Sequence, residues 1–214
     1  MENTNQLKIY SQYSNQIALK ATPGHFATSS SHINYYIDIT TLKTRSSEAK
    51  AVAKAMVQDY VISTVIDTII CLDGTDIIGA YLADELMSAG FMSSNTHDDI
   101  YVLTPEQNSA GQLIFRENHM PMIRGKNTLV LLASATTGKT LRTALECIEY
   151  YGGTIVGVSS IFSAAASIHG VNINSLFTSA DIPGYDTYTT STCPLCKASH
   201  PIDAIVNSFG YAKL

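Results

Sequence analysis

The 214-residue sequence is poor in charge and lacks long apolar runs. Charged residues make up 14% of it, and the formal net charge of −5 argues against general binding to nucleic acid or to anionic membranes. No segment approaches the roughly 18 apolar residues that a membrane-spanning helix needs. Residues 1–15 are polar and lack the hydrophobic core of a signal peptide, so we expect a cytoplasmic protein.

Cysteine is also scarce, with four residues in the chain. Two of them form one Cys-x-x-Cys at 193–196, and the other two, Cys71 and Cys147, are expected in the core. This usage is typical of a reduced compartment and argues against a disulfide framework. Apolar residues make up 45% of the chain, enough for a sizeable core, and the length suits one α/β domain with modest extensions or two small domains.

The sequence does contain an alternation of helix-like and strand-like segments. Hydrophobic periodicity, capping residues and turn signals predict these elements. The expected helices are 7–21, 46–60, 77–89 and 139–151, with Pro23 and Gly24 expected to end the first of them. The expected strands are 34–41, 65–72, 99–103, 112–115, 129–133 and 154–162.

The alternation from residue 46 onward predicts a mainly parallel sheet with helices on both faces. In such sheets, ligands bind beyond the carboxyl ends of the strands. Two unusual turns, at 73–76 and 134–140, are expected at that edge, so they are the first places to look for a site.

The most informative stretch is 128–140, a strand of the buried type that runs into a small-residue turn opening a helix. Such a turn gathers backbone N–H groups that can hold a phosphate. One pattern with this layout is the P-loop, Gly-x4-Gly-Lys-Ser/Thr. Gly138, Lys139 and Thr140 fit it, but Ala133 occupies the position of its first glycine, which the tight turn requires.

The same turn resembles the phosphoribosyl-diphosphate (PRPP) loop of type I phosphoribosyltransferases. That loop is an apolar strand, two acidic residues, two further residues and then Thr-Thr-Gly-x-Ser/Thr. Residues 136–140 match this ending, whereas Leu132 and Ala133 stand where the acidic pair would be. The half of the motif that holds the phosphate is present, and the half that holds the ribose is absent.

Three more segments resemble orotate phosphoribosyltransferases, in particular the bacterial type with a Cys-Pro-Leu-Cys tail. Residues 24–38 resemble the Gly-His-Phe segment of that family, residues 152–158 its Gly-Gly-x-x-Val-Gly-Val strand, and residues 193–202 its tail. The resemblance implies an α/β fold of the type I phosphoribosyltransferase kind. Its parts would be an N-terminal helix and hood region at 1–45, a core at 46–183 and a cysteine-containing tail at 184–214.

The resemblance also implies an activity, which is transfer of phosphoribosyl from PRPP to a pyrimidine-type base. Mg²⁺ would be the cofactor, and a C2 homodimer would be the usual assembly. Individual residues receive roles from their matched positions. Thr136, Thr137, Gly138, Lys139 and Thr140 would hold the 5′-phosphate, Gly74 and Thr75 the diphosphate, Tyr35 or Tyr36 would pack on the base, and Arg116 would close over the diphosphate.

The departures from the family pattern support a second hypothesis, a non-catalytic protein that binds a phosphate ester such as a nucleoside monophosphate. It would act as a sensor or as a partner-binding dimer. Besides the lost acidic pair, Ala164 stands where the family has an arginine that pairs with the orotate carboxylate. Asp73 and Asp76 flank Gly74 and would repel a diphosphate unless Mg²⁺ lies between them.

Cys193 and Cys196, followed by His200, have the spacing of metal ligands. A closed zinc site needs four ligands, and the fourth would come from His169 or from a second subunit. A reduced knuckle without metal and a redox role are the alternatives.

Overall fold

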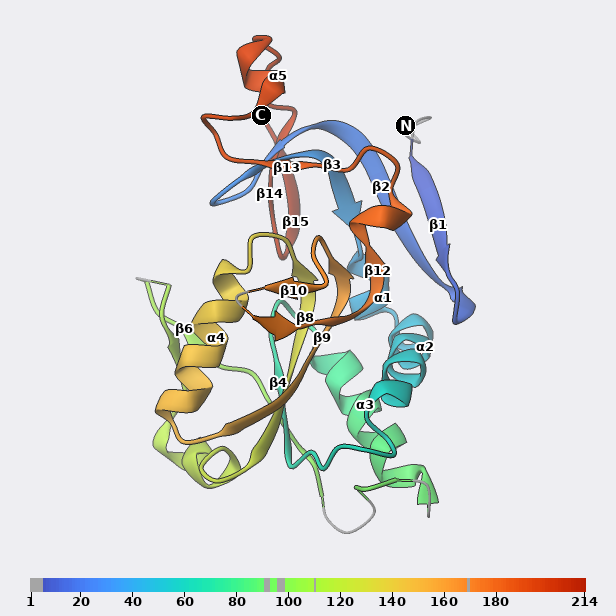
Figure 1. The fold of residues 1–214 in the computed structure, drawn as a ribbon, viewed down its shortest axis with the longest axis vertical. Helices are drawn as coiled ribbons and strands as arrows, with labels where there is room; N and C mark the ends of the chain where they lie inside the picture. The colour runs from blue at the N-terminus through green and yellow to red at the C-terminus, as the bar shows by residue number, and fades with distance from the viewer. Residues whose placement is uncertain (1–5, 91–92, 96–98, 110, 169) are drawn as a thin grey trace.

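The computed structural model describes residues 6–90, 93–95, 99–109, 111–168 and 170–214. A core sheet is flanked by helices, and a second sheet, which we call the hood, lies beyond one end of the core strands (Figure 1). No helix in these ranges combines the length and the apolar character needed to cross a membrane.

All strands of the core sheet run parallel, in the order β12-β9-β8-β4-β5. This confirms the predicted parallel sheet. The strands are β4 (Thr68–Cys71), β5 (Tyr101–Leu103), β8 (Asn127–Ala135), β9 (Thr154–Ser163) and β12 (Asn174–Thr178).

Helices α2 (Ser46–Met56) and α3 (Asp76–Ser88) cover one face of this sheet, and α4 (Lys139–Tyr150) covers the other (Figure 1). Two apolar clusters correspond to these two layers. At Gly79 of α3, an added Cβ would lie 2.3 Å from the Cys71 Sγ, so the glycine allows the helix to pack closely on β4. The short helices are α1 (Thr40–Thr44), η1 (Val57–Asp59), η3 (Glu117–Met122), η4 (Ser179–Asp181) and α5 (Pro194–Lys197).

The hood sheet is built from both ends of the chain. Its order is β13-β3-β2-β14-β15, with β1 paired to β2, so strands of the predicted tail lie on both sides of the N-terminal strands. The strands are β1 (Leu7–Ser11), β2 (Ser14–Ala27), β3 (His32–Asp38), β13 (Thr187–Tyr188), β14 (Ala204–Asn207) and β15 (Gly210–Lys213). Two small hairpins complete the fold, β6 (Glu106–Gln107) with β7 (Leu113–Ile114) and β10 (Ser167–Ile168) with β11 (Val171–Asn172).

The predicted helix at 7–21 is wrong, because this segment forms the β1–β2 hairpin. Ile17, Leu19 and Ala21 are fully buried and alternate with less buried residues, which is the period of a strand with one face on the core. Pro23 lies at an irregularity in the pairing of β2 with β3, where a strand tolerates proline. It therefore does not end a helix.

A buried contact among Tyr60, β9 and β12 holds this edge of the core sheet together. The Tyr60 hydroxyl lies 2.7 Å from the Ser159 Oγ and accepts a hydrogen bond from the Asn174 amide at 3.0 Å. Gly157 leaves space for the ring, since a Cβ there would lie 2.6 Å from Tyr60 Cε1. The neighbouring Ser160 hydroxyl is buried and has no hydrogen-bond partner among the described residues.

These adjacent serines should respond oppositely to loss of the hydroxyl. Ser159→Ala removes a partner of a buried tyrosine and is expected to lower the free energy of unfolding by about 1–3 kcal/mol. Ser160→Ala removes a buried group without a partner and should be neutral or stabilising. Urea unfolding followed by far-UV circular dichroism measures both, and equal destabilisation by the two variants would contradict the hydrogen-bond assignment.

Candidate functional site

The two predicted turns lie side by side at the carboxyl edge of the core sheet. β4 and β8 are direct neighbours, with Cys71 opposite Leu131. The turn after β4 is fastened to β8, since the Leu72 N–H donates to the Leu131 carbonyl at 2.9 Å. The predicted position of both turns is confirmed.

The turn at 136–140 leads from β8 into α4. Gly138 has a φ of +76°, a backbone conformation that favours glycine, and it is the residue before the first turn of α4. No side chain of the described residues caps this helix, while Thr137, Lys139 and Thr140 are exposed. Uncapped N–H groups with exposed hydroxyl and ammonium groups beside them suit an anion.

One side of this turn is covered. Ile168 of the β10–β11 hairpin packs on Gly138, where an added Cβ would lie 2.0 Å from the Ile168 Cγ2. On another side, the loop between β2 and β3 approaches, with the Ser30 Oγ 3.5 Å from the Thr137 Oγ1. A ligand would therefore enter between the hood loop and the exposed side chains of the turn.

The turn after β4 is tightly built. Asp73 and Gly74 have φ values of +58° and +74°, so two successive residues adopt the left-handed conformation, which is uncommon for an aspartate. Thr75 is buried, and its hydroxyl donates to the Leu72 and Leu131 carbonyls. Thr75 was predicted to hold the diphosphate with Gly74, and its hydroxyl is engaged by the protein backbone.

Lys43 of α1 is a residue of this site that sequence reasoning missed. It is buried, and its ammonium donates to the carbonyls of Asp73 (2.6 Å) and Ser208 (2.8 Å). It also lies 3.8 Å from the position that a Cβ on Gly74 would occupy. Burial lowers the pKa of Lys43, against the opposing effect of the nearby carboxylates. No motif or spacing in the sequence distinguishes Lys43 from an ordinary surface lysine, so it could not have been predicted as a site residue.

Leu132 and Ala133, which the resemblance aligns with the acidic pair, are core residues. Leu132 belongs to the apolar cluster under α4, and Ala133 to the cluster under α2 and α3.

Burial raises the pKa of the Asp73 carboxyl in the adjacent turn, although Lys43 and the Ala133 N–H act in the opposite direction. Asp76 accepts a hydrogen bond from the Thr104 hydroxyl.

Arg116 follows the β6–β7 hairpin and forms a two-point ion pair with Glu106, with N–O distances of 2.9 and 2.5 Å. Both side chains are exposed. The hairpin rests on α4, where the Cys147 Sγ lies 3.3 Å from the Leu113 carbonyl oxygen. The guanidinium expected to close over a diphosphate is therefore bound to a carboxylate.

Tyr35 and Tyr36 on β3 are both half-buried against the core. The Tyr36 ring packs edge-on against Tyr211, with centroids 5.0 Å apart, and lies 5.9 Å from the Phe26 ring. Burial raises the pKa of Tyr36. The Tyr36 ring is thus engaged by two aromatic neighbours, whereas no ring contact involves Tyr35 among the described residues, so Tyr35 is the freer of the two rings.

The predicted metal ligands Cys193 and Cys196 lie together, but their neighbours are His25 and His32 of the hood. The His200 side chain, which was predicted to be a metal ligand, is not part of this cluster. Its backbone carbonyl oxygen lies 3.0 Å from the His25 Nδ1. His169 lies outside the described residues. The remaining cysteines are buried (Cys71) and half-buried (Cys147), in line with the core expected for them.

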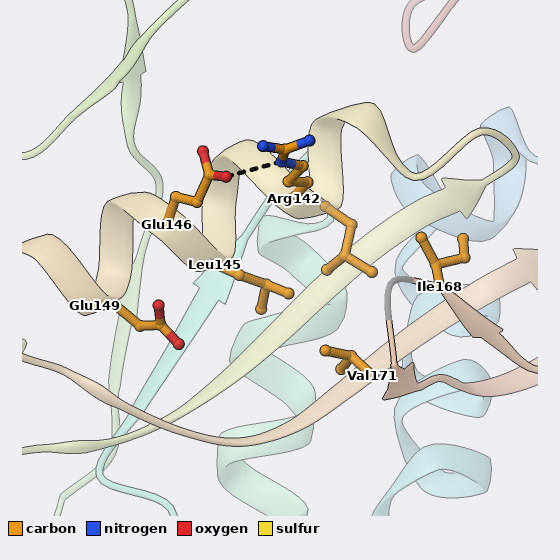
Figure 2. Close-up of a pocket in the computed structure, with 7 residues that line it drawn as sticks. Arg142, Leu145, Glu146, Glu149, Ile168 and Val171 are labelled. Carbon is orange, nitrogen blue, oxygen red and sulfur yellow. Dashed lines mark hydrogen bonds and ion pairs between the residues drawn. The ribbon is translucent and has the colours of Figure 1, made fainter.

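A cavity of about 350 Å³ lies between α4 and the β10–β11 hairpin. Figure 2 shows the charged side chains of α4 on one side of it, with Ile168 and Val171 on the other. Arg142 is paired with Glu146 at 2.8 Å, and Glu149 adds a further negative charge. This lining does not suit a phosphate, so the exposed turn, and not this cavity, is the candidate site.

No protein-family model matches this sequence. Orotate phosphoribosyltransferases from two strains of Thermus thermophilus are each 28% identical to it over 105 residues. The matched part is 48% of this chain and 55% of theirs, so the chain spans about half the length of these curated relatives.

Solved structures resemble a larger share of the chain. Orotate phosphoribosyltransferase of Mycobacterium tuberculosis H37Rv in complex with PRPP has a TM-score of 0.51 at 18% identity, covering 68% of this chain and 82% of that one. The same enzyme with inorganic phosphate gives 0.51 at 17% identity, over 69% and 80%. Adenine phosphoribosyltransferase of Leishmania tarentolae gives 0.50 at 15% identity, over 69% and 78%. The chain therefore has the fold of the type I phosphoribosyltransferases.

Proposed function

We propose that this protein binds PRPP at the two adjacent turns and transfers its phosphoribosyl group to a base. A pyrimidine-type base such as orotate is the first candidate, because the curated relatives are orotate phosphoribosyltransferases. The observation that carries the proposal is the exposed, uncapped start of α4 beside the turn of Asp73 and Gly74. The start of α4 suits the phosphate end of PRPP, and the adjacent turn at Gly74 lies where the diphosphate end would be.

In this proposal, the N–H groups at the start of α4 hold the 5′-phosphate, with Thr137, Lys139 and Thr140 beside them. The diphosphate lies at Gly74, and the positive charge of Lys43 lies beside this turn, where its ammonium donates to the Asp73 carbonyl. Transfer passes through an oxocarbenium-like centre, so the site must hold the leaving group and place the base nitrogen opposite it. Arg116 would have to exchange Glu106 for the diphosphate.

The residues present do not fit a carboxylate site for Mg²⁺. Leu132 and Ala133 offer no oxygen ligand from their side chains, Asp73 is half-buried beside Lys43, and Asp76 is hydrogen-bonded to Thr104. Any Mg²⁺ dependence would therefore come from metal carried by the diphosphate itself. No step of the proposed reaction is assigned to a metal held by the protein.

A second candidate is a non-catalytic protein that binds a phosphate ester, such as a nucleoside monophosphate, as a sensor or a partner-binding dimer. The burial of Leu132 and Ala133 favours it, because no side chain at these positions can accept a hydrogen bond from ribose. Ala164 likewise offers no charge for the carboxylate of orotate. Homodimer formation and a cytoplasmic location stay predictions under both candidates.

Substitutions in the turn should weaken PRPP binding. Thr137→Val and Lys139→Gln each remove a polar contact to the 5′-phosphate and are expected to raise the Kd for PRPP by about tenfold or more. Isothermal titration calorimetry measures the affinity, and Lys54→Gln, an exposed lysine on α2, is the control. If both turn variants bind PRPP as the wild type does, the phosphate does not lie at this turn.

Turnover separates the two candidates. Diphosphate release from PRPP is measured with a panel of bases that includes orotate and uracil. If transfer occurs, Arg116→Gln should lower kcat by about tenfold or more with little change in the KM of the base, because the cation acts on the leaving group. Arg142→Gln is the matched control, since Arg142 forms a similar exposed ion pair on α4. PRPP binding without release with any base would exclude transfer and support the non-catalytic candidate.

A further inference from the structure

A compact cluster of two cysteines and two histidines lies in the hood and has no role in the proposed function. Four ligand atoms, one each from His25, His32, Cys193 and Cys196, lie within 4.8 Å of one another. Cys193 is fully buried, and both histidines are more than nine-tenths buried. Two thiols and two imidazoles gathered in the interior are the donor set that zinc prefers.

The spacing of these atoms fits a single tetrahedral ion. With Zn–N near 2.0–2.1 Å and Zn–S near 2.3 Å, the edges of a tetrahedron are about 3.3 Å between nitrogens and about 3.6 Å between nitrogen and sulfur. In the structure, His25 Nε2 lies 3.0 Å from His32 Nδ1 and 3.5 and 3.6 Å from the Cys193 and Cys196 Sγ atoms. His32 Nδ1 lies 3.2 Å from the Cys196 Sγ.

The surroundings of His25 orient it as a ligand. Its Nδ1 lies 3.0 and 3.1 Å from the carbonyl oxygens of His200 and Pro201. Carbonyls only accept hydrogen bonds, so Nδ1 carries the proton and Nε2 presents its lone pair to the cluster. Metal-binding histidines commonly have such a partner on the other ring nitrogen. The Asp203 carboxylate also accepts the His25 backbone N–H at 2.7 Å, which fixes the residue itself.

We propose that His25, His32, Cys193 and Cys196 bind one structural zinc ion that joins the tail to the N-terminal strands β2 and β3 of the hood. All positions of a tetrahedral site are then filled by protein, so the ion would serve folding and not catalysis. The ligands come from both ends of the chain, since His25 and Cys193 are 168 positions apart. This site replaces the ligand set of Cys193, Cys196 and His200 that spacing alone suggests.

The ion would also set the position of the loop between β2 and β3. His25 and His32 flank that loop, and its Ser30 approaches Thr137 of the phosphate turn. Fixing both ends of the loop would hold it beside this turn. The zinc site itself does not depend on the proposed function, because its test needs no phosphate ligand.

The first test is metal content and coordination. Purified protein should contain about one zinc per chain by plasma mass spectrometry. After replacement with Co²⁺, it should show the visible d–d bands of a tetrahedral site and thiolate-to-cobalt charge transfer. Three results would each overturn the proposal. They are a protein that neither contains zinc nor takes up added Zn²⁺, an octahedral cobalt spectrum, and a Cys193–Cys196 disulfide in protein purified under reducing conditions.

Matched variants test the ligand set. His32→Gln should lose the bound zinc, while His200→Gln should retain it, since the His200 carbonyl and not its side chain contacts the cluster. Cys196→Ser should lose zinc, and Cys147→Ser, a half-buried cysteine outside the cluster, should retain it. Zinc loss in His200→Gln together with retention in His32→Gln would overturn the assignment. The cobalt spectrum of the wild type decides the question if a ligand variant does not fold.

Removal of zinc tests the joining role. Chelation should increase amide hydrogen exchange in residues 25–32 and in β14, while β4 and β8 in the core sheet keep their protection. Unchanged exchange in the hood after complete zinc removal would show that the ion does not hold the tail to strands β2 and β3.

Discussion

The parallel pairing of β4 with β8 is the constraint on which the rest of this structure depends. From this pair the sheet grows in opposite directions, with α3 leading from β4 to β5 on one side and α4 leading from β8 to β9 on the other. Right-handed crossovers in opposite directions place their helices on opposite faces, so the sheet is covered on both sides. The turns after β4 and β8 then meet at one edge, and this juxtaposition creates the candidate site.

The hood completes that edge through long-range polar contacts. The Lys43 ammonium joins the carbonyl of Asp73 in the core to that of Ser208 between the tail strands. Such a buried cation would be costly without partners, and its two carbonyls provide them. Ser30 approaches Thr137 from the other side. The tail is therefore part of the hood, and the hood is fastened to the turns that the proposed function uses.

The departures from the phosphoribosyltransferase pattern follow a physical division. A phosphate can be held by backbone N–H groups at a helix start, which depend on conformation and on a glycine such as Gly138. Side-chain acceptors for ribose hydroxyls depend on residue type, and the buried Leu132 and Ala133 supply none. The structure thus contains a helix start that could hold a phosphate, and it offers no side-chain acceptor for ribose at Leu132 and Ala133. Binding and turnover are therefore separate questions for this protein.

The helices and buried strands of the core were predictable from the sequence because their signals are local. The 3.6-residue periodicity identified α2 and α4, and the apolar runs identified β4 and β8. The same reasoning failed at β1 and β2. Residues 7–21 were predicted to form a helix that ends at Pro23, but they form two paired strands, and Pro23 lies where the pairing of β2 with β3 is irregular. That hairpin is specified by burial of one face on the core, which no short window of sequence reveals.

The sequence by itself determined the parallel sheet, the two turns at its edge and the presence of a Cys-x-x-Cys. Only the tertiary structure decided which side chains meet there. It brought Lys43 to Asp73, directed the Thr75 hydroxyl into the protein, paired Arg116 with Glu106 and placed the histidines of the hood beside the cysteines. The physical reason is that such contacts join residues far apart in the chain, with positions set by packing of whole elements and not by local propensity.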